Sequence, residues 1–147
     1  MICGRAWYVD YSKQRSGLML KALGVMLVSM LVLDLIWIQL VMKQLYQNHV
    51  AHLLRGSSGS IAVDPLATLM VYLVMLLGLF YLAVRPSVNW QEAMVSGAVA
   101  GGFAYGTFAL TNHAIFKDWN WTLTCFDLGW GTAMMAMVAV FGFMVYR

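Results

Sequence analysis

The sequence predicts an all-α integral membrane protein, an up-down-up-down bundle of four transmembrane helices. Of its 147 residues, 62% are hydrophobic and only 10% are charged, and the mean hydropathy is +0.75. Soluble domains carry roughly 25% charged residues, so a soluble fold is excluded. Four apolar runs are each long enough to cross a hydrocarbon core of about 30 Å at a helical rise of about 1.5 Å per residue. The later connections are short, so neighbouring helices must run antiparallel.

We expect the four helices at about residues 18–42, 66–84, 92–114 and 123–146. Asp64-Pro65 is typical of a helix start, with an N-cap followed by proline in the first turn, and Arg85-Pro86 is typical of an end. The first run is too long for the core of a secretion signal, and no small-x-small cleavage site follows it. We therefore expect it to remain as a membrane anchor.

The chain divides into a basic cytoplasmic tail, residues 1–17, and a four-helix transmembrane domain, residues 18–147. The first connection, residues 43–63, is the only long one. Its first part is expected to extend the first helix as an amphipathic segment at the interface. Its run GSSGS, residues 56–60, is typical of a flexible surface loop.

The distribution of Lys and Arg predicts the orientation. One side holds Arg5, Lys13, Arg15, Lys21, Arg85 and Arg147, and the other holds Lys43, Arg55 and Lys117. The side richer in Lys and Arg usually faces the cytoplasm. Both termini are therefore expected there.

Two carboxyl groups stand inside the apolar runs. By the helix rise, Asp34 lies about 12 Å from the outer end of the first helix, and Asp127 lies about four residues inside the fourth, which starts on the same side. An ionisable residue at such depth is costly unless it faces the bundle interior, a partner or water. Both aspartates are therefore candidate functional residues in the outer half of the membrane.

Each aspartate begins the same short pattern, Asp-Leu-x-Trp. Trp37 follows Asp34 by three residues, and Trp130 follows Asp127 by three. Residues three apart share one face of a helix. Each helix therefore presents a carboxyl group beside an indole N–H donor.

The third helix ends in an unusually polar run, residues 105–113. Tyr105 and Asn112 fall on one face, and Thr111 belongs to a second stripe. Tyr105 is expected about as deep as Asp34. The polar groups of three helices thus converge in one leaflet. Two interpretations stay open, interhelical hydrogen bonding and a small site for a proton, a cation or a polar headgroup.

Other residue types give weaker indications. His49, His52 and His113 fall on the outer side, where imidazole and carboxylate groups together are the ligands of one type of metal site. Their spacing does not favour one, so we expect solvated or headgroup-contacting histidines and no metal. Cys3 and Cys125 form no C-x-x-C motif, and we interpret them as unpaired thiols.

Glycines recur at a spacing of four in the third helix, as Gly97/Gly101 and Gly102/Gly106. Small residues at this spacing let membrane helices approach closely. We expect a packing centre here, with a hinge or ligand clearance as the alternative.

Three motifs together resemble a family of small bacterial inner-membrane proteins of unknown function. They are Asp34-x-x-Trp37, the run YGTFALTN at 105–112, and DLGWGT at 127–132, with Trp119 between the last two. The resemblance extends from about Leu18 to the C-terminus. It implies the four-helix fold and a bacterial inner-membrane location, but no activity. An acidic residue usually precedes Leu-Thr-Asn in the family, and here that position is Ala109.

The leading functional hypothesis is a binding or transport protein with an outward-facing polar pocket for a small ligand or proton. Its candidate residues are Asp34, Trp37, Tyr105, Thr111, Asn112, Asp127 and Trp130. The alternatives are a membrane-embedded enzyme of lipid, fatty-acyl or isoprenoid metabolism, with an aspartate as general acid or base, and an accessory subunit of a membrane complex. The expected partners are the lipid bilayer and a possible homo-oligomer or larger complex. We expect no cofactor and no nucleic acid.

Overall fold

The computed structural model describes the backbone of residues 3–55 and 62–147, and the side chains of residues 13–55 and 62–147. Its elements in chain order are the helices α1 (Cys3–Trp37), η1 (Ile38–Met42), α2 (Lys43–His49), η2 (Ala51–Leu53), α3 (Pro65–Leu79), η3 (Phe80–Val84), α4 (Trp90–Ile115) and α5 (Trp121–Tyr146). Four helical stretches are long and apolar enough to cross a membrane, Lys13–His49, Pro65–Val84, Trp90–Ile115 and Trp121–Tyr146. The predicted all-α fold with four spans is confirmed.

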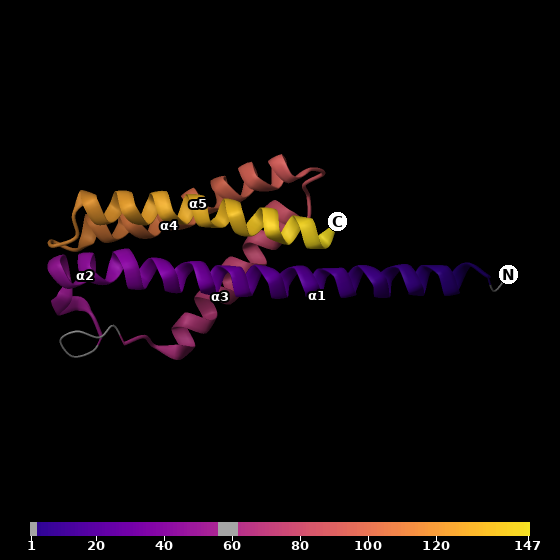
Figure 1. The fold of residues 1–147 in the computed structure, drawn as a ribbon, viewed down its shortest axis with the longest axis horizontal. Helices are drawn as coiled ribbons and strands as arrows, with labels where there is room; N and C mark the ends of the chain where they lie inside the picture. Colours follow the sequence, from indigo (N-terminus) through magenta and orange to yellow (C-terminus); the bar gives the residue numbers. More distant parts are fainter. Residues whose placement is uncertain (1–2, 56–61) are drawn as a thin grey trace.

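The first helix is longer than expected. Its backbone is helical from Cys3, through the region expected as a tail, and it continues past Met42 into α2. In Figure 1, α2 follows the line of α1, so this segment extends the first helix as the sequence predicted. The run at residues 56–60 lies outside the described residues.

Two five-residue π-helices interrupt the spans. In η1 the Lys43 N–H donates to the Ile38 carbonyl, and in η3 the Arg85 N–H donates to the Phe80 carbonyl. Each bond spans five residues, one more than in an α-helix. Such insertions are frequent at functional sites, and η1 follows Asp34 and Trp37 directly.

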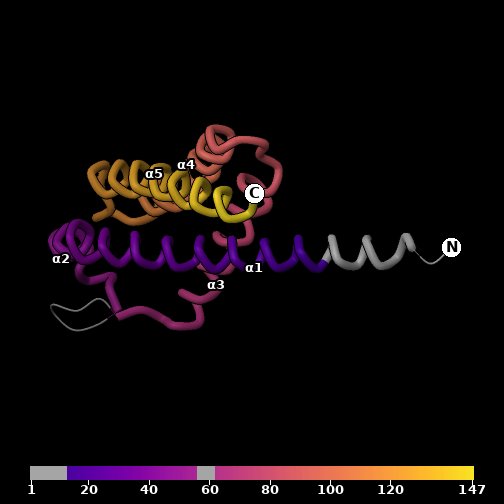
Figure 2. Tube along the Cα trace, turned by 45° about the vertical axis from the view of Figure 1, so that its right-hand side comes forward, coloured from indigo at the N-terminus to yellow at the C-terminus, as the bar shows by residue number. Residues whose placement is uncertain are grey.

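The arrangement has a tight antiparallel pair, α4 and α5, with α1 packed along α5. In Figures 1 and 2, α1 lies beside this pair. Figure 1 shows α3 crossing the other helices obliquely, and it meets α4 and α5 chiefly through η3. The inner core, buried where α1, η3 and α5 meet, includes Met26, Met30, Phe80 and Val138.

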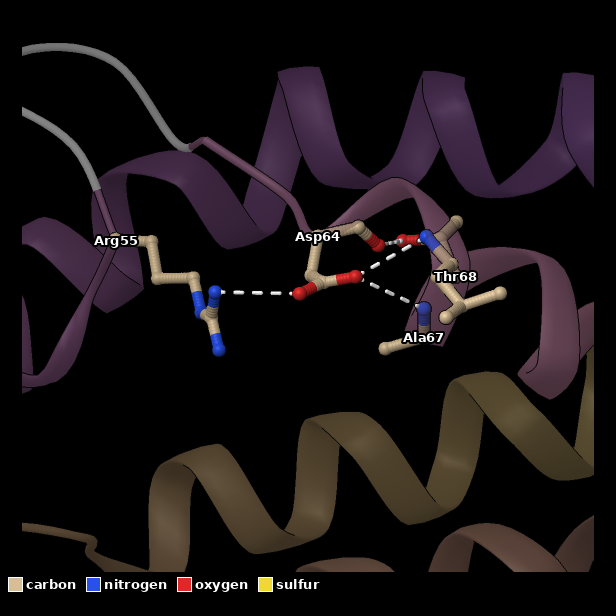
Figure 3. A network of polar contacts seen from close by, with 5 residues as sticks. Arg55, Asp64, Ala67 and Thr68 are labelled. Atoms are coloured by element: carbon tan, nitrogen blue, oxygen red, sulfur yellow. Dashed lines mark hydrogen bonds and ion pairs between the residues drawn. The ribbon is translucent and has the colours of Figure 1, made fainter.

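The start of α3 follows the predicted pattern. One carboxylate oxygen of Asp64 accepts hydrogen bonds from the backbone N–H groups of Leu66 and Ala67, both at 3.0 Å. The Arg55 guanidinium lies 3.3 Å from the other oxygen, as Figure 3 shows. The Asp64 side chain therefore satisfies two of the N–H groups that a helix start leaves unpaired.

The glycines of α4 let α5 approach closely. A Cβ on Gly101 would overlap the Gly131 carbonyl oxygen, and one on Gly97 would lie 2.6 Å from the Ala139 Cβ. Gly102 and Gly106 are less tight, with nearest side-chain atoms 3.3 and 3.2 Å from an added Cβ. The glycine spacing therefore serves helix packing, as the sequence predicted.

Candidate functional site

Both membrane aspartates line one cavity of about 160 Å³, here called the carboxylate cavity. Its lining residues come from α1, η1, α2, α4 and α5 and are Asp34, Trp37, Ile38, Met42, Tyr46, Tyr105, Phe108, Asp127 and Trp130. The cavity has room for a few water molecules, each of which occupies about 30 Å³ in the liquid. Ile38 and Met42 belong to η1, so the π-helix forms part of its wall.

Asp34 is held by donors from two other spans. The Tyr72 hydroxyl of α3 donates to Oδ2 at 3.0 Å, and the Trp130 Nε1–H of α5 donates to Oδ1 at 3.2 Å. The carboxyl group of α1 thus ties α3 and α5 together. Both distances are within the normal range of hydrogen bonds.

Asp127 is more deeply buried and less well bonded. The residue is 6% exposed, and the Tyr46 hydroxyl lies 3.5 Å from each of its oxygens. Hydrogen bonds from hydroxyl groups are normally about 2.7–2.8 Å long, so this contact is weak. Asp127 therefore keeps most of its capacity to accept a proton or bind a cation.

The two Asp-Leu-x-Trp patterns contact each other across α1 and α5 through one hydrogen bond and one ring stack. Trp130 donates to Asp34 on the neighbouring helix, and its ring stacks on Trp37 with a centroid distance of 4.4 Å and an interplanar angle of 2°. The Trp37 Nε1–H is buried and has no hydrogen-bond partner among the described residues. The stacked rings of Trp37 and Trp130 thus form one aromatic side of the carboxylate cavity.

Tyr105 lines the same cavity as the two carboxyl groups. It interacts electrostatically with both Asp34 and Asp127, and its hydroxyl makes no hydrogen bond within the described part of the chain. A Cβ on Gly131 would overlap the Tyr105 ring, so this glycine provides the space that the ring occupies. The free hydroxyl is available to a ligand.

A second hollow, here called the interfacial cleft, adjoins the cavity. It measures about 470 Å³ and is lined by Tyr46, Val50, Leu53, Leu54, Phe108, Asn112, Phe116 and Trp119. The Trp119 Nε1–H is buried and has no partner among the described residues. The cleft shares Tyr46 and Phe108 with the carboxylate cavity.

Five of the seven candidate residues from the sequence meet in the carboxylate cavity: Asp34, Trp37, Tyr105, Asp127 and Trp130. Asn112 lines the interfacial cleft, and Thr111 is exposed and lines neither hollow.

Sequence reasoning missed Tyr46 and Tyr72. Tyr72 is a single polar group in the otherwise apolar run VYLVMLL, which was the one available signal, and Tyr46 lies in the segment expected at the interface.

The histidines lie near the end of the bundle where α2 ends and α5 begins. The His49 Nδ1 contacts the Leu45 carbonyl oxygen, and His52 lies 3.4 Å from Asp118. His113 contacts Thr124 at 3.4 Å. Among the described residues, no three His, Cys, Asp or Glu side chains gather in a way that would hold a metal ion. Cys125 is exposed and forms no disulfide within the described part of the chain.

Comparison with other proteins supports the membrane assignment. Neither the curated proteins nor the solved structures include a significant match to this sequence. A family defined by its sequence pattern does match, over residues 19–144, and it begins close to the point where the resemblance noted above begins. The chain belongs to this family, which is described as predicted membrane protein (DUF2177).

Proposed function

We propose that the protein binds a proton or a small cation in the carboxylate cavity and serves as a binding or transport protein for it. One observation carries the proposal: two carboxyl groups line the same small cavity, and none of the nine described residues around it is cationic. Two carboxylates without a counter-charge are unfavourable in a low-dielectric interior. A bound proton or cation would neutralise part of this charge.

The difference between the two aspartates supports distinct roles. Asp34 is fixed by hydrogen bonds to Tyr72 and Trp130, and it holds the cavity wall in place. Asp127, with its single weak contact to Tyr46, is the better acceptor. The free Tyr105 hydroxyl adds a neutral oxygen ligand.

The proposal extends to the location of the site. The distribution of Lys and Arg favours an orientation with both termini in the cytoplasm, and the resemblance described above implies the bacterial inner membrane. In that orientation the cavity lies in the outer half of the bilayer, and the interfacial cleft lies at the outer surface.

The test replaces each carboxyl group by its neutral amide, as Asp34→Asn and Asp127→Asn. In proteoliposomes, we expect each variant to insert and fold but to lose most of the proton flux, followed with an internal pH-sensitive dye, and of the binding of tetramethylammonium, followed by calorimetry. Asp118→Asn is the matched control, because this carboxyl group is exposed and outside the cavity.

Two results would contradict the proposal. If folded Asp127→Asn keeps wild-type flux and binding, the cavity is not the site. If both cavity variants fail to fold while Asp118→Asn folds normally, the aspartates serve only as hydrogen-bonding groups between helices.

A further inference from the structure

The carboxylate cavity and the interfacial cleft share two lining side chains, those of Tyr46 and Phe108. The Tyr46 hydroxyl reaches Asp127 on the cavity side, while its ring lies 5.9 Å from the Trp119 ring on the cleft side. Phe108 meets Trp119 edge to face at 5.8 Å. A ligand occupying both hollows would therefore lie against both of these side chains.

The cavity has the chemistry of an organic ammonium site. Beside its two carboxyl groups it exposes the rings of Trp37, Tyr46, Tyr105, Phe108 and Trp130. Ring faces attract cations, and aromatic groups combined with negative charge suit ammonium heads that carry carbon substituents. A strongly hydrated metal ion prefers several oxygen ligands instead.

The cleft has a different character. Apart from Tyr46, Asn112 and Trp119 its lining is aliphatic or phenyl, and it is roughly three times as large as the cavity. Leu53 and Phe116 are 45% and 40% exposed, so part of the lining of the cleft is accessible from outside the protein. Its shape and apolar lining suit an alkyl chain that enters from the membrane.

From this juxtaposition we infer that the ligand is an amphiphile with an ammonium head and an apolar tail. The head occupies the carboxylate cavity, and the tail lies in the interfacial cleft, past Tyr46 and Phe108. The inference rests on the proposed function, that the cavity binds a cation, and it adds the ligand class and the place of the tail.

The experiment compares two probes with one head and different tails, tetramethylammonium and dodecyltrimethylammonium. Binding to the purified full-length protein is measured by tryptophan fluorescence in a maltoside detergent, which carries no charge and no amine. Because burial of each methylene contributes about 0.8 kcal/mol, we expect the dodecyl probe to bind at least about tenfold more tightly.

Variants assign the head and the tail to their hollows. Asp127→Asn should weaken both probes about tenfold or more. Phe116→Ala should weaken only the dodecyl probe, and Leu53→Ala should do the same if Phe116→Ala fails to fold. The matched control is Phe103→Ala, since this phenylalanine lies on α4, the helix that ends just before Phe116, but is 77% exposed and lines neither hollow.

Two outcomes separate this inference from the proposed function. If both probes bind equally tightly, or if the cleft variants weaken both alike, the tail site is wrong while the cation site stands. If neither probe binds and Asp127→Asn also leaves proton flux unchanged, the proposed function fails as well. Added phosphatidylethanolamine distinguishes the source of the ligand. If this lipid competes with the probes, the ligand is a membrane aminolipid. If both probes bind and the lipid does not compete with them, the ligand is a free amine.

Discussion

At the scale of single residues, the Asp34 carboxyl group connects three spans. Its two donors, Tyr72 and Trp130, come from α3 and α5, and the bond to Tyr72 is a direct polar link between α1 and the oblique α3. Hydrogen bonds between membrane helices contribute about 0.6 kcal/mol on average and at most about 1.7 kcal/mol. Loss of one of them should therefore be measurable without unfolding the protein.

Tyr72→Phe removes only the hydroxyl group, so we expect the free energy of unfolding to fall by about 0.6 kcal/mol. Denaturation in a titration with dodecyl sulfate measures this. Tyr81→Phe is the control, because Tyr81 is exposed and makes no hydrogen bond in the described part of the chain. An equal loss in both variants would contradict a specific role for the bond to Asp34.

Asp64, outside the spans, gives a prediction about pH. The pKa of Asp64 lies below its ordinary value of 3.8, chiefly because the Ala67 N–H donates to the carboxylate. The Arg55 charge and the Leu66 N–H lower this pKa further. Since the folded-state pKa is lowered, the stabilisation is present above the ordinary pKa and is lost as the pH falls through the folded-state pKa. We expect the carboxyl ¹³C shift of Asp64 to titrate at a pH below the ordinary value of 3.8, and a titration above that value would contradict the cap.

Only part of the residue-level picture could be predicted from the sequence. The aspartates stood out because charge in an apolar run is costly, and their tryptophans because residues three apart share a face. The sequence of one helix does not show which neighbour a side chain meets, so the donation from Trp130 to Asp34 was not visible. Tyr46 was missed for a related reason, since α2 follows the axis of α1 and carries Tyr46 to Asp127.

At the scale of elements, the contact between α4 and α5 depends on glycines facing each other. Gly131 has the Tyr105 ring where a Cβ would be, whereas Gly129, two residues earlier, has open space. The same helix thus holds a constrained glycine and an unconstrained one.

Gly131→Ala should lower the free energy of unfolding by about 1–3 kcal/mol, the usual cost of an overpacked interior, and displace Tyr105 from the cavity. Gly129→Ala should be neutral or stabilising by up to about 1 kcal/mol, because alanine is the better helix former. Dodecyl sulfate titration of both variants checks this. Equal stability of the two would show that the Tyr105 ring can move at no cost.

The spans were predictable because length and hydropathy define them, and the N-cap at Asp64 because Asp-Pro is a specific local signal. The π-helices were not. A π-turn inserts one residue without a change of composition, so the runs around Ile38 and Phe80 look like ordinary apolar helix.

At the scale of the whole molecule, four spans require both ends of the chain to lie on one side. We expect reporter domains fused at the N- and C-termini to report the same compartment, and a reporter inserted at residues 56–60 to report the opposite one. By the distribution of Lys and Arg, the termini should be cytoplasmic. Termini on opposite sides would mean that one of the four helical stretches does not cross.

The extra residue in η1 determines the direction in which every later side chain of the first span points around the helix axis. At 3.6 residues per turn, one residue corresponds to about 100° of rotation about the helix axis. If the Ile38–Met42 segment wound as a plain α-helix, Tyr46 would turn away from Asp127 by about that angle while Asp34 stayed where it is. The π-helix thus determines that Tyr46 belongs to the wall shared by the carboxylate cavity and the interfacial cleft.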